Sequence, residues 1–386
     1  MAAIFVTERT VFPLKRNVYL MYAMALLHGM VFYAPIATLY RQAVGISVFQ
    51  ITLIESISVA LMILLEIPWG RVADRIGYRR TMIVCCLLYV VSKVIFWKAD
   101  GFGWFLAERV LLSVVCAGLS GVDVSILYLS CDGEQAQKVF GIYNNLGQVG
   151  LLLAAGVHGL WMGENYRLAA LATVFSYGAA AVLIFGLKEV KALSPHTKKP
   201  KLGSVVRQLL DNKKLLFLVL SVALFNETHQ TITVFLNQLK YVEVGMSPSA
   251  ISVAFLVMTV IGLGGGWSAR LTKRLGEKRF GSLLFLAVCA SCVLLAWTKL
   301  PLLAVLGIAL LRLCFYLFQP LQSTLQNRMV TTEDRATALS VNAMVLDVAA
   351  IFTNLLFGKI ADQNLTIALL FGAGLALVGF FLYQNS

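Results

Sequence analysis

Four ionisable side chains stand inside long apolar runs of this chain, and their setting points to proton chemistry. Glu227 lies near the middle of the run 214–241 and Asp347 near the middle of 336–361, while Asp123 and His28 lie in the runs 102–129 and 18–40. An ionisable group in hydrocarbon costs at least about 2.5 kcal/mol, so each should face a partner or a cavity. Carboxylates and histidines in such places can exchange a proton near physiological pH. We therefore predict these four as proton-coupling residues, with Glu227 first.

Each of these residues also has a structural interpretation, which the sequence leaves open. Glu227 could form a static salt bridge, for example with Arg312, and Asp347 could belong to a structural pair. His28 could be a hydrogen-bonded packing residue. A structural role is also expected for three charged residues nearer the ends of their runs, where long side chains can reach the membrane surface: Glu55, Lys93 and Glu108.

Polar side chains also recur at helical spacing inside three of the apolar runs. In the run 102–129, Arg109 and Asp123 share one stripe, but 14 residues of helix place them about 21 Å apart, so they cannot pair. Two further stripes follow the runs 214–241 and 301–328 and are expected to wall a ligand cavity. Their members are Asn226, Gln230 and Asn237 in the first, and Arg312, Tyr316 and Gln319 in the second.

Membrane-spanning helices must position these residues, because the composition excludes a soluble protein. The 386 residues are 59% hydrophobic and only 13% charged, whereas about 25% charged is typical of soluble domains. Twelve apolar runs, from 18–40 to 365–384, are each long enough to cross about 30 Å of hydrocarbon as a helix. The sequence therefore predicts an all-α membrane protein with twelve transmembrane helices.

The basic residues are sorted between the gaps that separate the apolar runs. If the N-terminus is inside, cytoplasmic segments hold 23 of the 32 lysines and arginines, and the opposite side holds six. Short cytoplasmic loops collect Lys and Arg, so both termini are predicted to be cytoplasmic. Topology thus explains the net charge of +13, and no nucleic-acid partner is expected.

The longest gap divides the chain into two similar halves. We expect an N-terminal six-helix bundle over 1–187, a cytoplasmic linker with a short interfacial helix over 188–213, and a C-terminal six-helix bundle over 214–386. Segments 70–80 and 269–279, 199 residues apart, both keep a glycine, Gly77 or Gly276, and a basic end, but only the first has Asp74. Two pseudo-symmetric bundles are typical of transporters, whose substrate site lies between the repeats near the midplane.

The segment between the second and third runs carries a specific motif. It reads Gly70-x-x-x-Asp74-Arg75-x-Gly77-x-Arg79-Arg80 and follows Glu66-Ile67-Pro68-Trp69. This motif resembles the loop signature of the major facilitator superfamily, in the form found in many bacterial drug-efflux-type members. The resemblance implies that the loop is a conformational gate; a basic turn that only fixes orientation is the alternative. The gate residues would be Gly70, Asp74, Arg75, Gly77, Arg79 and Arg80.

The resemblance also implies a substrate cavity lined by the first, fourth, seventh and tenth spans. Aromatic side chains on those spans, with few charges, suit an amphipathic or aromatic organic ligand better than a sugar. Antiporters of the family often have a Gly-Pro pair in span five, where this chain has Ala154 and Ala155. The expected cavity residues are Tyr33, Arg109, Asn226, Gln230, Phe235, Asn237, Arg312, Tyr316 and Gln319.

The function expected from these patterns is proton-coupled export of a small amphipathic compound by alternating access. Import of a metabolite or sugar, a lipid flippase and a non-transporting receptor are the alternatives. An enzyme is not expected, because HExxH, GxSxG and P-loop patterns are missing. No cofactor or metal is expected, since the CxxC pair Cys289 and Cys292 lacks a second ligand pair. The expected partners are a small-molecule substrate, protons and membrane lipids, for a monomer that spans the bacterial inner or plasma membrane many times.

Overall fold

The computed structural model describes residues 15–131, 136–190, 212–262, 267–329 and 335–386, and these residues form helices without any strand. Ten helical segments among them are long and apolar enough to cross a membrane. The fifth and eighth expected spans correspond to α7 (Ala136–Val157) and α12 (Pro248–Ile261), which are not among those ten. The all-α membrane fold is confirmed. Of the twelve expected spans, ten correspond to described helical segments that are long and apolar enough to cross a membrane.

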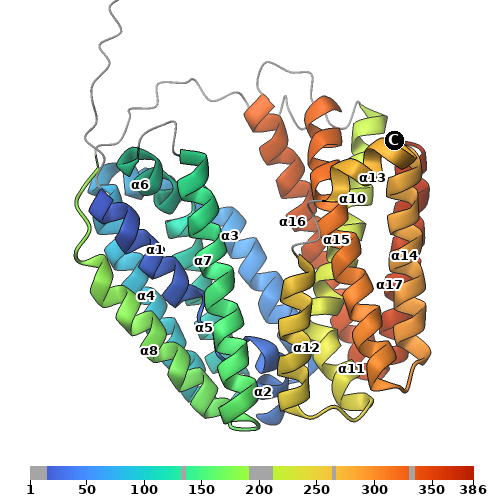
Figure 1. The fold of residues 1–386 in the computed structure, drawn as a ribbon, viewed down its shortest axis with the longest axis horizontal. Helices are drawn as coiled ribbons and strands as arrows, with labels where there is room; N and C mark the ends of the chain where they lie inside the picture. The colour runs from blue at the N-terminus through green and yellow to red at the C-terminus, as the bar shows by residue number, and fades with distance from the viewer. Residues whose placement is uncertain (1–14, 132–135, 191–211, 263–266, 330–334) are drawn as a thin grey trace, which may run out of the picture.

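The first six expected spans form one group of helices, blue to green in Figure 1. The segment between α8 and α10, residues 191–211, lies outside the described part of the chain, and so does the interfacial helix expected there. The elements of this first half are α1 (Lys15–Gly29), η1 (Ala34–Ile36), α2 (Ala37–Ala43), α3 (Val48–Ile76), α4 (Tyr78–Lys98), α5 (Phe102–Leu119), α6 (Val122–Ser130), α7 (Ala136–Val157), the π-helix η3 (His158–Met162) and α8 (Tyr166–Ile184).

The other six expected spans form a second group beside the first, yellow-green to red in Figure 1. Its elements are α10 (Lys213–Thr231), the π-helix η4 (Ile232–Leu236), α11 (Asn237–Glu243), α12 (Pro248–Ile261), α13 (Ser268–Leu275), α14 (Glu277–Trp297), α15 (Pro301–Met329), α16 (Arg335–Gln363) and α17 (Leu365–Gln384).

The two halves repeat the same turn geometry. Gly77 joins α3 to α4 with φ 91° and ψ 152°, and Gly276 joins α13 to α14 with φ 80° and ψ 150°. A side chain at either position would be strained, because L-residues rarely adopt this positive φ. Ser47 and Ser247 likewise cap α3 and α12 through their hydroxyls. The weak sequence repeat therefore corresponds to a structural repeat at these turns.

Three of the expected spans depart from a single regular α-helix. The first stops at Gly29 and resumes through η1 and α2, where Pro35 has no backbone N–H to continue an α-helix. The fourth breaks between α5 and α6, and the seventh changes to the π-helix η4. Interrupted helices and π turns are frequent at binding sites in membrane proteins. Irregular helix geometry thus occurs in three of the four spans predicted to line the cavity, and all three are candidate membrane spans.

The starts of α1, α10 and α14 and the end of α15 lie at one end of the molecule, at the top in Figure 1. We call it the basic end, because Lys15, Lys213, Lys278 and Arg328 belong to these helix ends. The other end, where α2 and α11 lie, is called the opposite end.

The two halves meet through contacts toward the opposite end. The Asp362 carboxylate accepts hydrogen bonds from the amides of Val48 (2.6 Å) and Phe49 (3.0 Å) at the start of α3. Gln238 on α11 accepts from the Thr38 amide of α2 at 2.9 Å, and His158 Nδ1 lies 2.7 Å from the Ser252 hydroxyl. A Cβ at Gly358 would collide with Thr52, so α16 packs directly against α3.

Candidate substrate and proton site

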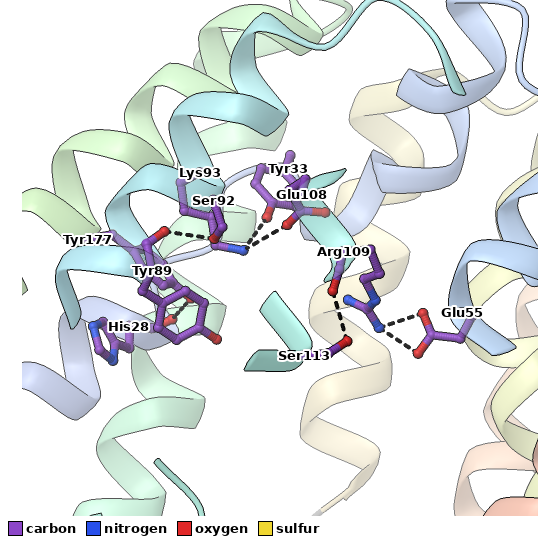
Figure 2. Close-up of polar contacts among 10 residues, drawn as sticks. All are labelled: His28, Tyr33, Glu55, Tyr89, Ser92, Lys93, Glu108, Arg109, Ser113 and Tyr177. Carbon is purple, nitrogen blue, oxygen red and sulfur yellow. Dashed lines mark hydrogen bonds and ion pairs between the residues drawn. The ribbon is translucent and has the colours of Figure 1, made fainter. Parts of the chain in front are cut away.

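A buried ion pair of the first half joins α4 to α5 (Figure 2). The Lys93 ammonium lies 3.6 Å from a Glu108 carboxylate oxygen and donates a 2.9 Å hydrogen bond to the Tyr33 hydroxyl. It also lies 5.1 to 5.7 Å from the ring centroids of Tyr33, Tyr89 and Tyr177. Lys93 is 4% exposed and Glu108 1%. Neither side chain reaches toward the membrane surface as the sequence allowed, because opposite charge and aromatic faces compensate them inside the bundle.

Arg109, the next residue of α5, has a different partner. One guanidinium nitrogen lies 2.5 Å from both carboxylate oxygens of Glu55 on α3 (Figure 2). The two side chains are 24% and 10% exposed, so this pair is less buried than Lys93 and Glu108. Glu55 is therefore a partner of Arg109 inside the protein, and it does not reach toward the membrane surface as the sequence allowed.

Glu227 stands without a salt bridge at the boundary between the halves. The residue is 6% exposed, and its Oε2 has no hydrogen-bond partner among the described residues. The charges of Asp347 on α16 and Glu55 on α3 both act on it, so three carboxylates from three helices lie within electrostatic range. No ion pair with Arg312 forms within the described part of the chain. Glu227 is therefore a buried carboxylate without an ion pair among the described residues.

Arg312 lies on α15 among aromatic residues. Its guanidinium lies 5.7 Å from the ring centroid of Phe255 on α12. One turn further along α15, Phe315 stacks on His229 of α10 with centroids 3.9 Å apart and planes 6° from parallel. Through these contacts the tenth span meets the eighth at Phe255 and the seventh at His229.

The other two predicted proton sites lie elsewhere. His28 stacks on Tyr177 with centroids 4.7 Å apart, within the aromatic group around Lys93. Asp123 lies in the first turn of α6, where its carboxylate accepts a 2.7 Å hydrogen bond from the amide of Val124. A carboxylate at a helix N-terminus stabilises the helix start. Neither residue is among the groups whose charge acts on Glu227.

The predicted cavity residues of the second half differ in their surroundings. Phe235 and Asn237 are buried, Gln230 is exposed, and the amide oxygen of Asn226 has no hydrogen-bond partner among the described residues. On α15, the Gln319 side chain accepts a 3.0 Å hydrogen bond from Gln322, and the Tyr316 ring packs against the backbone at Gly262. The structure thus places all six residues on α10, η4, α11 and α15: Asn226, Gln230, Phe235, Asn237, Tyr316 and Gln319.

The predicted gate is attached to the end of the first half. Arg79 Nε donates to the Leu187 carbonyl at 2.6 Å, and the Arg79 amide donates to Glu189 at 3.1 Å. Arg75 and Arg80 are exposed. Gly70 and Asp74 belong to α3, but their side-chain surroundings lie outside the described part of the chain. The loop therefore contacts the segment that follows α8.

The comparison with known proteins identifies the family. Residues 18–354 match the family model described as Major Facilitator Superfamily. This chain belongs to that family, whose members are transporters rather than enzymes. No curated protein sequence matches it.

Several solved structures share the fold. A variant of the nucleoside transporter NupG is 15% identical, with a TM-score of 0.80 over 95% of this chain and 99% of that one. A bacterial homolog to the human lysosomal transporter Spinster, inward-facing and unoccupied, is 17% identical, with a TM-score of 0.71 over 96% and 95%. A D-xylose-proton symporter is 13% identical, with a TM-score of 0.71 over 96% and 97%. At these identities the likeness establishes the fold alone.

Sequence reasoning missed the pairing of Lys93 and the role of Asp362. The sequence did contain a signal for the aromatic surroundings of Lys93, since Tyr89 and Lys93 are four residues apart and share one helix face. Asp362 gave no such signal, because its partners are backbone amides more than 300 residues away in the chain.

Proposed function

We propose that this protein is a secondary active transporter that couples proton binding at Glu227 to the export of a small amphipathic organic compound. The observation that carries the proposal is the unpaired Glu227 carboxylate, which lies at the boundary of the halves near Asp347 and Glu55. A protonated Glu227 would relieve the repulsion between its carboxylate and that of Asp347. Proton binding would therefore favour a different arrangement of α10 and α16 from the one that the ionised site favours.

We further propose that the bundles 1–187 and 214–386 are the moving bodies, joined by a cytoplasmic linker. All hydrogen bonds between the halves that the described residues form involve the opposite-end half of the helices. Such an arrangement fits a state closed at the opposite end, and alternating access would require these contacts to break. The loop around Asp74 and Arg75 is proposed as the gate at the basic end, and the basic end as the cytoplasmic one.

The test is transport by the full-length protein in proteoliposomes with an imposed pH gradient. We expect the gradient to drive the movement of amphipathic dyes by the parent. Glu227→Gln should lose the gradient-driven part and retain exchange of dye across the membrane without a gradient. Asp347→Asn should reduce the coupled flux, and Glu164→Gln, an exposed carboxylate after η3, serves as the matched control. Parent-like gradient-driven transport by both Glu227→Gln and Asp347→Asn would refute the coupling assignment.

Import of a hydroxylated metabolite is the second candidate. Unpartnered side-chain amide atoms of Asn226, Gln322 and Gln326 favour it, because such atoms suit the hydroxyl groups of a sugar or nucleoside. The shared fold with a nucleoside transporter and a D-xylose-proton symporter agrees with it. Uptake of a labelled nucleoside or sugar with protons moving in the same direction would favour this candidate over export.

A further inference from the structure

Within the described residues, Arg312 is a cation inside the membrane without an anionic partner. It lies 11 residues after Pro301 on α15, which is about 17 Å along the helix and near half the depth of the hydrocarbon. Its Nε is buried without a hydrogen-bond partner, and no salt bridge to it forms within the described residues. The phenols of Tyr241 and Tyr316 lie within electrostatic range of it. A ring face such as that of Phe255 compensates a guanidinium only in part.

Two further donors without partners lie in the same surroundings. Tyr241 on α11 is 1% exposed, and its hydroxyl has no hydrogen-bond partner among the described residues. His229 is 8% exposed, and its Nδ1 is also unpartnered there. The charge of Arg312 acts on both residues. An imidazole whose Nε2 accepts from the Thr233 hydroxyl, 3.3 Å away, carries its proton on Nδ1 and donates there.

We propose that Arg312, Tyr241 and His229 form an anion-binding subsite, and that the transported compound carries a carboxylate or phosphate group. A guanidinium, a phenol and an imidazole N–H can all donate to the oxygens of one such group. Buried polar groups normally have partners. Arg312 and the two donors on which its charge acts lack one among the described residues, which indicates a partner that comes from outside the chain. This inference rests on the proposed transport function and narrows its substrate class to organic anions.

Arg109 provides the contrast that makes the inference specific. Its guanidinium contacts both oxygens of Glu55, so its charge is neutralised by the protein itself. The one carboxylate of the seventh span near this region, Glu227, forms no ion pair with Arg312. A ligand anion at Arg312 would supply the charge that Glu55 supplies to Arg109.

The surrounding rings would hold the rest of the ligand. Phe255 lies under the guanidinium, and Phe315 stacks on His229 while its edge meets Tyr316 at a centroid distance of 5.5 Å. Aromatic faces next to a few convergent polar groups are typical of sites for amphipathic organic molecules. The ligand expected here has an apolar or aromatic body with one anionic group.

The test measures ligand binding to the purified full-length protein in detergent, without a membrane or a gradient. The probes are naphthoate, naphthyl phosphate and the neutral naphthamide, which share one aromatic body. We expect the parent to bind at least one of the two anions about tenfold more tightly than the amide, since one charge-assisted hydrogen bond suffices for that ratio. The preferred anion would tell whether the site suits a carboxylate or a phosphate.

Variants of the subsite show which residues cause the preference for an anion over the amide. Arg312→Gln should abolish it, Arg312→Lys should keep part of it, and Tyr241→Phe, which removes only a hydroxyl, should lower it without a change in fold. Arg328→Gln, an arginine on the same helix that pairs with Glu277, is the matched control and should keep the full preference. The inference fails if the parent binds neither anion better than the amide, or if Arg312→Gln and Tyr241→Phe both retain the parental ratio.

The binding test of the subsite and the transport test of proton coupling can fail independently of each other. Loss of the anion preference with intact gradient-driven transport would refute the subsite alone. An intact preference with parent-like transport by Glu227→Gln would refute the proton coupling alone.

Discussion

The two halves share turn geometry, but within the described residues Arg109 and Arg312, one intramembrane cation of each half, differ in whether a carboxylate pairs with them. In the first half, Lys93 pairs with Glu108, and Arg109 pairs with Glu55. In the second half, Arg312 and Glu227 stand apart, and neither forms an ion pair within the described residues. Charges that are neutralised inside the protein stabilise one arrangement of helices, whereas unpaired charges are free to bind a proton or a charged ligand. We interpret the first half as the fixed framework and the second as the half that responds to protons and ligand.

The largest expected effect comes from breaking a pair in the first half. Glu108→Gln leaves the Lys93 ammonium buried and uncompensated, which should lower the free energy of unfolding by about 3–5 kcal/mol. Thermal unfolding of the purified protein measures it. The double change Lys93→Met with Glu108→Leu should recover most of the loss, because no buried charge remains. Equal stability of Glu108→Gln and the control Glu164→Gln would contradict this view of the first half.

A smaller effect is expected where the halves meet. Asp362→Asn weakens two charge-assisted hydrogen bonds to the start of α3, and charged hydrogen bonds contribute about 1.5–3 kcal/mol each. The equilibrium should shift about tenfold or more toward opening at the opposite end. Spin-label distances across that end measure the shift, with Asp100→Asn, an exposed acid at the same end, as the control. Unchanged distances would remove Asp362 from the closing contacts.

A change of opposite sign is expected for the unpaired cation of the second half. Arg312→Leu removes a charge that no carboxylate compensates, so the ligand-free protein should keep its stability or gain about 1 kcal/mol. The measurement is again thermal unfolding without ligand. A loss as large as that of Glu108→Gln would mean that Arg312 has a structural partner, and the comparison between the halves would no longer hold.

The smallest effect is expected for an ion pair at the membrane surface. Arg328 contacts Glu277 at 2.7 and 3.0 Å, and the two side chains are 59% and 37% exposed. Exposed ion pairs contribute little because water screens them. Glu277→Gln should leave the unfolding temperature unchanged, and a clear decrease would show that surface pairs also stabilise the second half.

The membrane fold was predictable because hydrocarbon imposes a simple rule on the sequence. Backbone groups must be satisfied within each span, so apolar runs become helices, and the motif around Gly77 indicated the family. The partners of Lys93 and Arg109 and the surroundings of Glu227 were not predictable, because they depend on how each helix is rotated and where it is interrupted. Helical spacing placed Arg312 and Tyr316 on one face correctly, but it could not tell that Tyr241 from another span would join them.

The π-helix η4 gives span seven a means of changing register. One extra residue is held in that turn, between Glu227 and the Gln238 side chain that accepts hydrogen bonds from α2. Conversion of the turn to α geometry would rotate α11 by about 100° relative to α10. Such a rotation would withdraw Gln238 from the amides of Thr38 and Leu39. A change of geometry in η4 would thus alter the contact of the seventh span with α2 at the opposite end.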